Sequence, residues 1–274
     1  DDALAVRASV KAVREDLAGA QADAEEATRV NPKNAIAWNN LGHVLIANGE
    51  YREALRALER SIALSKRYPI ALQNRGQAHY YLDEYEDAVK SFDASLKLVP
   101  SDPMTICWKA ASLRENEDLD ESLQVLDAAL RRFPEHAELN NELGLTHQRN
   151  EDLGKALVAF DRAVKLSPTD SQILMNRAAA HAENGAIPAA LADYATAARV
   201  DPKNYAPWND RGLLLSEQGE HAKAVDDFTM AIKLSPGDSI LHNNRGHSYY
   251  GQGKYQEAID DYSEAIRVAP DVAQ

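Results

Sequence analysis

Apolar residues recur along the chain at helical spacing, in pairs of short stretches separated by polar turns. One such stretch places small and apolar residues at i, i+4, i+7 and i+8, which is one face of an α-helix: Ala54, Leu58, Ser61 and Ile62. The stretch before it has Trp38 and, seven residues later, Leu45. Because similar pairs follow every 34 residues, the pattern predicts helices near 36–48 and 52–65 and again at each 34-residue step.

The period of 34 is also visible at single positions. Every 34th residue of one series is small: Gly42, Gly76, Ala110, Gly144, Ala178, Gly212 and Gly246. A second series is proline, interrupted only by Lys66: Pro32, Pro100, Pro134, Pro168, Pro202, Pro236 and Pro270. About eight such units fill the 274 residues, so the sequence predicts an all-α solenoid of stacked helix pairs with one continuous core.

Glycines and capping residues mark the ends of the predicted helices. Four glycines fall at the fifteenth position of a unit, where we expect them to stop the first helix: Gly49, Gly185, Gly219 and Gly253. Five units have glycine at the eighth position, inside a helix, where it costs ~1 kcal/mol relative to alanine. We therefore expect two helices to approach closely there. Most first helices follow an Asn or Asp cap: Asn34, Asp102, Asp170, Asn204 and Asp238.

The composition narrows the classes of function. A net charge of −13 and the lack of a Lys/Arg-rich run argue against nucleic acid as the main partner. No uninterrupted apolar stretch approaches the ~20 residues that a membrane helix needs, so no membrane insertion is expected. The single cysteine, Cys107, excludes an internal disulfide framework and a multi-cysteine metal site. With no signal peptide in view, we expect a cytoplasmic protein; Asp1 at the start leaves a processed or exported chain open.

These residues together resemble the tetratricopeptide repeat (TPR) family. Residues 239–272 show its pattern most fully: Gly246, Gly253, Tyr255, Ala258, Tyr262, Ala265 and Pro270. The resemblance covers seven units: 35–68, 69–102, 103–136, 137–170, 171–204, 205–238 and 239–272. Residues 1–34 are a weaker copy, which we expect to form an atypical end unit whose first helix has its apolar stripe in a shifted register: Ala3, Val6, Val10, Val13 and Leu17.

The resemblance implies a right-handed superhelix of antiparallel helix pairs whose first helices line a concave groove. It implies a scaffold that holds an extended peptide or partner segment in that groove as part of a larger protein, and no enzyme activity or cofactor. The alternative is a self-assembly element that stacks through the solenoid ends or the convex face. Only four residues follow Pro270, so we expect the last apolar face to be covered by further chain or by another molecule.

The family pattern places the fifth, sixth, ninth, twelfth and thirteenth positions of a unit inward. Side-chain amides dominate the fifth and sixth, and a ladder of amides offers donors and acceptors to a peptide backbone; amides on any solvated face are the simpler explanation. Trp108 either anchors an apolar ligand side chain or packs inside like Trp38 and Trp208. The candidate groove residues are Asn40, Asn74, Trp108, Arg114, Asn141, Arg149, Asn176, Asn209 and Asn244.

Charged residues allow further predictions. Arg114 and Arg149 either meet an acidic ligand or are neutralised by Glu115 and Glu142. No unit has Lys at its fifth position, so the carboxylate clamp of chaperone-binding family members is not expected. Positions seven and twenty-three suggest ion pairs between the two helices of a unit: Arg177/Asp193, Arg211/Asp227 and Arg245/Asp261.

The remaining reactive residues give no site. The histidines at the eleventh position favour packing over metal binding: His79, His147 and His181. The acidic run from Glu115 to Glu121 favours a solvated turn over a cation site. We therefore expect neither a catalytic nor a metal site.

Overall fold

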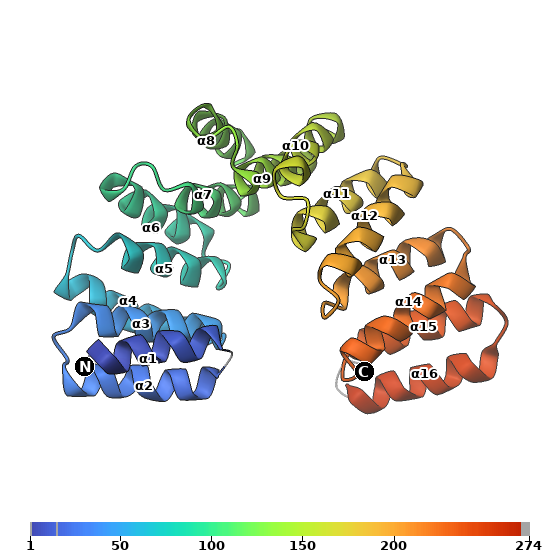
Figure 1. The fold of residues 1–274 in the computed structure, drawn as a ribbon, viewed down its shortest axis with the longest axis horizontal. Coiled ribbons are helices and arrows are strands. Elements are labelled where there is room, and N and C mark those ends of the chain that lie inside the picture. Colours follow the sequence, from blue (N-terminus) through green and yellow to red (C-terminus); the bar gives the residue numbers. More distant parts are fainter. Residues whose placement is uncertain (1, 15, 270–274) are drawn as a thin grey trace. The chain divides into compact units, whose positions relative to one another are not determined.

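The computed structural model of the chain describes residues 2–14 and 16–269 (Figure 1). These residues form sixteen α-helices and no strand. In chain order the helices are α1 (Asp2–Val13), α2 (Leu17–Val30), α3 (Ala35–Ala47), α4 (Tyr51–Leu64), α5 (Pro69–Tyr80), α6 (Tyr85–Leu98), α7 (Pro103–Glu115), α8 (Leu119–Arg132), α9 (Ala137–Arg149), α10 (Leu153–Leu166), α11 (Ser171–Glu183), α12 (Ile187–Val200), α13 (Ala206–Glu217), α14 (His221–Leu234), α15 (Ser239–Gly251) and α16 (Tyr255–Val268).

The chain divides into two compact units, residues 1–142 and 143–274, with the boundary inside α9. In the first unit, α1–α2, α3–α4, α5–α6 and α7–α8 pack as pairs, and each pair contacts the next; α11–α12, α13–α14 and α15–α16 do the same in the second (Figure 1). The prediction of an all-α array of stacked helix pairs is confirmed. The first predicted helices begin one residue earlier than expected, and the right-handed superhelix and the count of eight repeats stay predictions.

Positions are counted within each 34-residue repeat, so residues 1, 35, 69, 103, 137, 171, 205 and 239 are position 1. Position 15 has a left-handed backbone, with φ between 58° and 77°, at Gly49, Asp83, Glu117, Glu151, Gly185, Gly219 and Gly253. The next N–H donates to the carbonyl of position 11, as from Glu50 to Leu45 at 2.8 Å. This bond closes a Schellman motif, in which glycine carries no Cβ penalty. The predicted glycine stops are confirmed, and three acidic residues adopt the same turn.

Glycine at position 8 allows the two helices of a repeat to touch. A Cβ added at Gly76 would lie 2.5 Å from Cε1 of Phe92, and one at Gly212 would lie 2.8 Å from Cε1 of Phe228. Both phenylalanines are completely buried. The close approach that the sequence predicts is therefore real, and the residue at position 24 fills the space that the missing side chain leaves.

The predicted ion pairs are also present, as are four of the five predicted caps; α13 begins at Ala206, so Tyr205 rather than Asn204 occupies the cap position there. Asn34 accepts through Oδ1 from the backbone N–H groups of Ile36 at 3.0 Å and Ala37 at 3.3 Å. Arg211 donates from Nε and Nη2 to the two carboxylate oxygens of Asp227 at 2.7 and 2.6 Å. The pairs Arg177/Asp193 and Arg245/Asp261 have the same bidentate geometry. The three aspartates are buried, so these pairs are structural links within a repeat.

The first repeat keeps the register of the others. Arg7 and Asp23, at positions 7 and 23, form the same bidentate pair at 2.7 and 2.6 Å, and Ala8 at position 8 is completely buried. The expected shift of register in α1 is therefore wrong. The apolar stripe of α1 suggested a shifted register, but two of its residues, Val6 and Val10, are 63 % and 52 % exposed and therefore do not mark the buried face. Asp1, Pro270 and the side chain of Val13 lie outside the described residues.

Candidate functional site

The first helices of consecutive repeats are joined by amide–amide hydrogen bonds. In the first unit, Asn74 of α5 donates from Nδ2 to Oδ1 of Asn39 in α3 at 3.0 Å. In the second unit, Asn244 of α15 donates from Nδ2 to Oδ1 of Asn209 in α13, also at 3.0 Å. Each bond runs from position 6 of one repeat to position 5 of the repeat before. A side-chain amide has two N–H donors and a carbonyl oxygen with two lone pairs, so these bonds fix the amides in orientation without using all of their capacity.

The two amide pairs differ in access. Asn39 and Asn74 are only 4 % and 6 % exposed, whereas Asn209 and Asn244 are half-buried. The other predicted ladder residues are half-buried too: Asn40, Asn141 and Asn176. Asn40 accepts from Asn39 at 3.3 Å, and Asn176 accepts from Gln172 at 3.0 Å. A ligand thus has better access to the pair Asn209/Asn244 than to the pair Asn39/Asn74.

Trp108 of α7 belongs to an aromatic patch, which we define as Tyr51, Tyr80, Tyr81, Tyr85 and Trp108. Its ring centroid lies 5.3 Å from that of Tyr80 and 6.0 Å from that of Tyr81, both in edge-on geometry. It also stacks on the buried Phe92 at 6.4 Å. Trp108 is half-buried, so it packs on the preceding repeat and lies at the surface at the same time. The sequence left two alternatives for Trp108, a ligand anchor at the surface and packing inside the array, and each describes part of its surroundings.

Tyr80 and Tyr81 are groove candidates that the sequence reasoning did not name. Tyr81 is 44 % exposed and stacks on Tyr51 with centroids 5.0 Å apart. Tyr80 contacts Tyr85 edge-on at 5.6 Å. The signal was available, because positions 12 and 13 are among those that the family pattern places inward, and both are tyrosine in this repeat.

Arg114, also at position 12, is neutralised by two carboxylates. Its Nε donates to Oε1 of Glu142 at 2.9 Å, and its Nη1 pairs with Glu115. Burial raises the pKa of Glu142, and Arg114 opposes that rise. The positive charge of Arg114 is thus already balanced within the protein. Arg149, the other candidate for an acidic ligand, is exposed at the end of α9.

Carboxylates surround the aromatic patch. The Tyr85 hydroxyl donates to Oδ1 of Asp83 at 2.7 Å, and this bond, with burial and the charge of Asp83, raises the pKa of Tyr85 to about 12. Burial also raises the pKa of Tyr80, and the charges of Glu115 and Glu142 add to the rise. Among the described residues, the charges that act on Tyr80 and Tyr85 are thus three carboxylates, Asp83, Glu115 and Glu142, and one guanidinium, that of Arg114.

Comparison with known proteins decides the family. Tetratricopeptide repeat models match residues 6–50, 40–103, 109–171, 175–239 and 239–272. The chain belongs to the tetratricopeptide repeat family. No curated protein matches the sequence.

Several solved structures share this TPR fold. A tetratricopeptide repeat protein from Parabacteroides merdae has a TM-score of 0.71 at 18 % identity, over 90 % of this chain and 98 % of that one. The Cut9–Hcn1 hetero-tetramer of the APC/C has a TM-score of 0.65 at 17 % identity, over 99 % of this chain and 54 % of that one. MamA from Desulfovibrio magneticus RS-1, from residue 41 to its end, has a TM-score of 0.50 at 27 % identity, over 61 % of this chain and 95 % of that one.

The reactive residues occupy regular positions of the TPR framework. His79 at position 11 contacts Oε2 of Glu84 through Nδ1 at 2.7 Å, across the turn between its two helices. His147 and His181 occupy the same position and are half-buried. Cys107 is buried, and burial raises the pKa of its thiol, so it is a poor nucleophile. No group of three potential metal ligands occurs among the residues that the structure describes. TPR proteins are in general scaffolds rather than enzymes.

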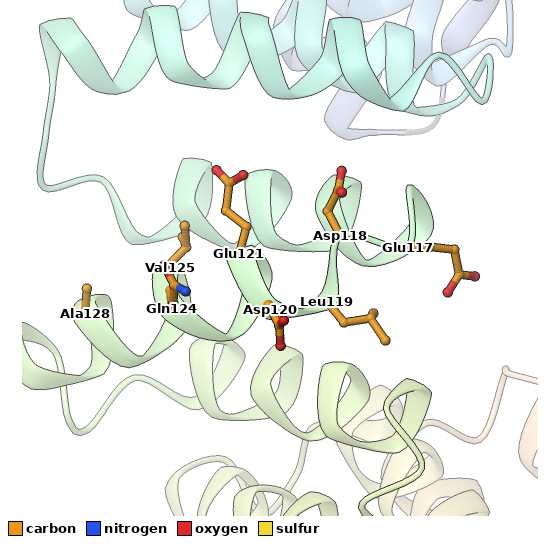
Figure 2. Close-up of a pocket in the computed structure, with 8 residues that line it drawn as sticks. All are labelled: Glu117, Asp118, Leu119, Asp120, Glu121, Gln124, Val125 and Ala128. Carbon is orange, nitrogen blue, oxygen red and sulfur yellow. The ribbon is translucent and has the colours of Figure 1, made fainter.

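The acidic run lies along an open hollow of about 710 Å³ at the start of α8. Figure 2 shows that the carboxylates of Glu117, Asp118, Asp120 and Glu121 point in different directions rather than toward one centre. Asp118 accepts from the Asn116 amide at 2.7 Å, and Glu121 lies 3.3 Å from the Lys109 ammonium. The arrangement favours a solvated turn over a cation site.

The length and polarity of the helices bear on whether the chain can span a membrane. Within residues 2–14 and 16–269, every helix is too short or too polar to span a bilayer. Together with the TPR fold, the surface features support a protein-interaction scaffold.

Proposed function

We propose that this TPR array holds an extended segment of a partner protein against its first helices, and that the aromatic patch selects a Lys or Arg side chain of that segment. The observation that carries the proposal is the patch itself, in which Tyr80, Tyr81 and Trp108 stand at positions that TPR proteins turn toward their groove. Exposed aromatic rings held by their neighbours offer a large contact area at low entropic cost, as interface hot spots do.

The charges around the patch favour a basic ligand. The charged groups beside the patch are Arg114 and three carboxylates: Asp83, Glu115 and Glu142. Arg114 forms ion pairs with two of these carboxylates, Glu115 and Glu142. A cation over the face of an aromatic ring gains about 0.5–2 kcal/mol, depending on how far it is desolvated. The net charge of −13 adds long-range attraction for a basic segment.

Within the second unit, one amide pair offers contacts that do not depend on ligand sequence, separately from the aromatic patch of the first unit. Asn209 and Asn244 are bonded to each other, so their orientation is set before a ligand arrives. Preorganised groups lose less conformational freedom on binding, which raises affinity. A peptide backbone is the ligand that presents both donors and acceptors at regular spacing.

A displayed library of random peptides tests the proposal. The immobilised chain is used for selection, the enriched peptides are sequenced, and their affinities are measured by fluorescence polarisation. We expect enrichment of Lys and Arg, and a loss of affinity of about tenfold in Tyr81→Ala, which corresponds to about 1.4 kcal/mol. Tyr81 is the better test residue because Asn74 and Trp108 also pack within the fold.

Tyr255→Ala is the matched control. Tyr255 lies in α16, is 61 % exposed and contacts another tyrosine, Tyr250, edge-on at 5.5 Å. We expect its replacement to leave the affinity unchanged. Selection of acidic peptides, or equal losses in the two variants, contradicts the assignment of the aromatic patch.

A further inference from the structure

Positions 3 and 10 of a first helix are two of the positions that pack on the preceding repeat. Ala37 at position 3 of α3 packs on Ala27, and Leu214 at position 10 of α13 packs on Ala178 and Tyr194. Position 10 is buried in all seven later repeats: Val44, Ala78, Ser112, Thr146, Ala180, Leu214 and Ser248. A first helix thus docks on the helix pair before it through these two positions.

In α1 the same two positions are apolar and exposed. Ala3 is exposed and Val10 is 52 % exposed, whereas Ala37 and Val44, the same residue types one repeat later, are almost completely buried. The docking face of α1 therefore has the composition of a face that is covered in α3.

The opposite face is open on the last pair, α15–α16. Position 24 is completely buried as Phe92, Phe160 and Phe228, yet Tyr262 is only half-buried. Ala265 at position 27 is half-buried, and Ile266 at position 28 is 54 % exposed. These side chains and Ile240 line a hollow of about 430 Å³. In the earlier repeats that have a repeat after them, positions 24 and 27 are buried, whereas position 2 is exposed there as well, as at Ile36 and Ile70.

We propose that α1 of a second copy of this chain docks on the α15–α16 face, so that copies associate head to tail. The occupant is a second copy because the chain carries both halves of one interface, and both repeat the packing between α3 and the α1–α2 pair. Polar contacts can follow the same rule. Arg245 at position 7 donates to the Thr229 hydroxyl at position 25 of the repeat before, at 3.2 Å. Across the proposed interface these positions are Arg7 and Ser263.

A head-to-tail interface uses two different surfaces, so two variants can complement each other. Val10→Asp places a charge on the apolar docking face of α1 and leaves the α15–α16 face intact. Ile266→Asp places a charge on the α15–α16 face and leaves α1 intact. Both side chains are more than half exposed, so the fold of each variant is expected to persist. Far-UV circular dichroism and thermal unfolding confirm that each variant is folded.

Sedimentation velocity over a range of concentrations tests the proposal. We expect the unmodified chain to associate as its concentration rises, each variant alone to stay monomeric, and an equimolar mixture of the two variants to form a dimer. Val158→Asp is the control, because Val158 is 71 % exposed on α10 and lies at neither face; it is expected to associate normally.

The outcomes separate cleanly. A monomer at every concentration overturns the proposal. A mixture that stays monomeric while the unmodified chain associates shows that another surface is used, and this overturns it too. Tyr81→Ala is expected to associate normally, so the result is independent of peptide binding at the aromatic patch.

Discussion

Gly76→Ala tests whether the contact between position 8 and position 24 limits what a repeat tolerates. The added Cβ would lie 2.5, 2.7 and 2.8 Å from three ring carbons of Phe92, against ~3.5–4.0 Å for a relaxed carbon–carbon contact. Phe92 is completely buried and stacks on Trp108, so its ring has no free space into which it can turn. Either the ring or the whole helix must move.

Two opposing effects set the size of the change. Alanine is favoured over glycine inside a helix by about 1 kcal/mol. Overpacking a tight core costs about 1–3 kcal/mol. We therefore expect the free energy of unfolding of Gly76→Ala to fall by up to about 2 kcal/mol, despite the better helix propensity. Ala110 with Leu126 is the natural alternative at these positions, so Phe92→Leu should relieve the clash, with a favourable coupling of about 1 kcal/mol.

Urea unfolding of the two single variants and the double variant gives this coupling directly. Gly154→Ala is the control, because Gly154 lies in the first turn of α10 and the nearest neighbour of an added Cβ is Asp152 Oδ1 at 3.8 Å. We expect that variant to be as stable as the parent or more stable by up to about 1 kcal/mol. Equal stability of Gly76→Ala and Gly154→Ala would refute the reasoning.

Three further predictions concern single charges and one turn. Asp227→Ala leaves Arg211, which is 21 % exposed, without its counter-charge; urea unfolding should show a loss of about 2–4 kcal/mol, and a much smaller loss for Glu264→Ala at an exposed pair. Burial raises the pKa of Asp210, so Asp210→Asn should raise stability at neutral pH by about 0.5–1 kcal/mol in thermal unfolding. Glu117→Gly should raise stability by about 0.5–1 kcal/mol, because φ is 65° at this residue.

The Asp210 prediction also fixes a pH dependence. Because the pKa is raised in the folded chain, losing the proton costs more there than in the unfolded chain. The contribution of Asp210 is therefore most favourable below the ordinary aspartate pKa, near 3.9, and is lost as the pH rises through the folded pKa. The advantage of Asp210→Asn should vanish at acidic pH, and an advantage that persists there contradicts this cause.

The predictions for Asp227→Ala and Glu117→Gly can also be contradicted by a specific result. The prediction for the buried pair fails if Asp227→Ala and Glu264→Ala are equally destabilising. A Glu117→Gly variant that is less stable than the parent would show that the turn gains more from the glutamate side chain than it loses to the left-handed backbone.

The repeat pattern predicted features that depend on one position at a time. A left-handed backbone at position 15 can be predicted without knowing which residues surround it, because glycine there, as at Gly49 or Gly185, is typical of that conformation. The missing side chain of Gly76 likewise implied a close helix without naming Phe92. The Arg and Asp residues at positions 7 and 23 predicted a contact because units 35–68 and 137–170 lose both together, although units 69–102 and 103–136 keep only the basic residue.

The candidate site was less predictable because its properties belong to pairs of residues in different repeats. An asparagine at position 6 looks available to a ligand until its partner at position 5 of the preceding repeat is considered. For Arg114 the sequence left an acidic ligand and neutralisation by Glu115 and Glu142 as alternatives, and only the contact with Glu142 decides between them. The stripe of α1 misled for a related reason, since the periodicity of a single helix does not show which of its faces meets the next repeat.

A few fixed sequence separations account for these contacts. Pairs 16 residues apart join the two helices of a repeat, as in Arg211 and Asp227. Pairs 28 residues apart join position 12 to position 6 of the next repeat, as in Arg114 and Glu142; Tyr80 and Trp108 stand in the same relation. Pairs 35 residues apart join the amides of neighbouring first helices. In a TPR chain, residue types compared at these separations therefore indicate which polar side chains are already paired and which aromatic residues gather at the surface.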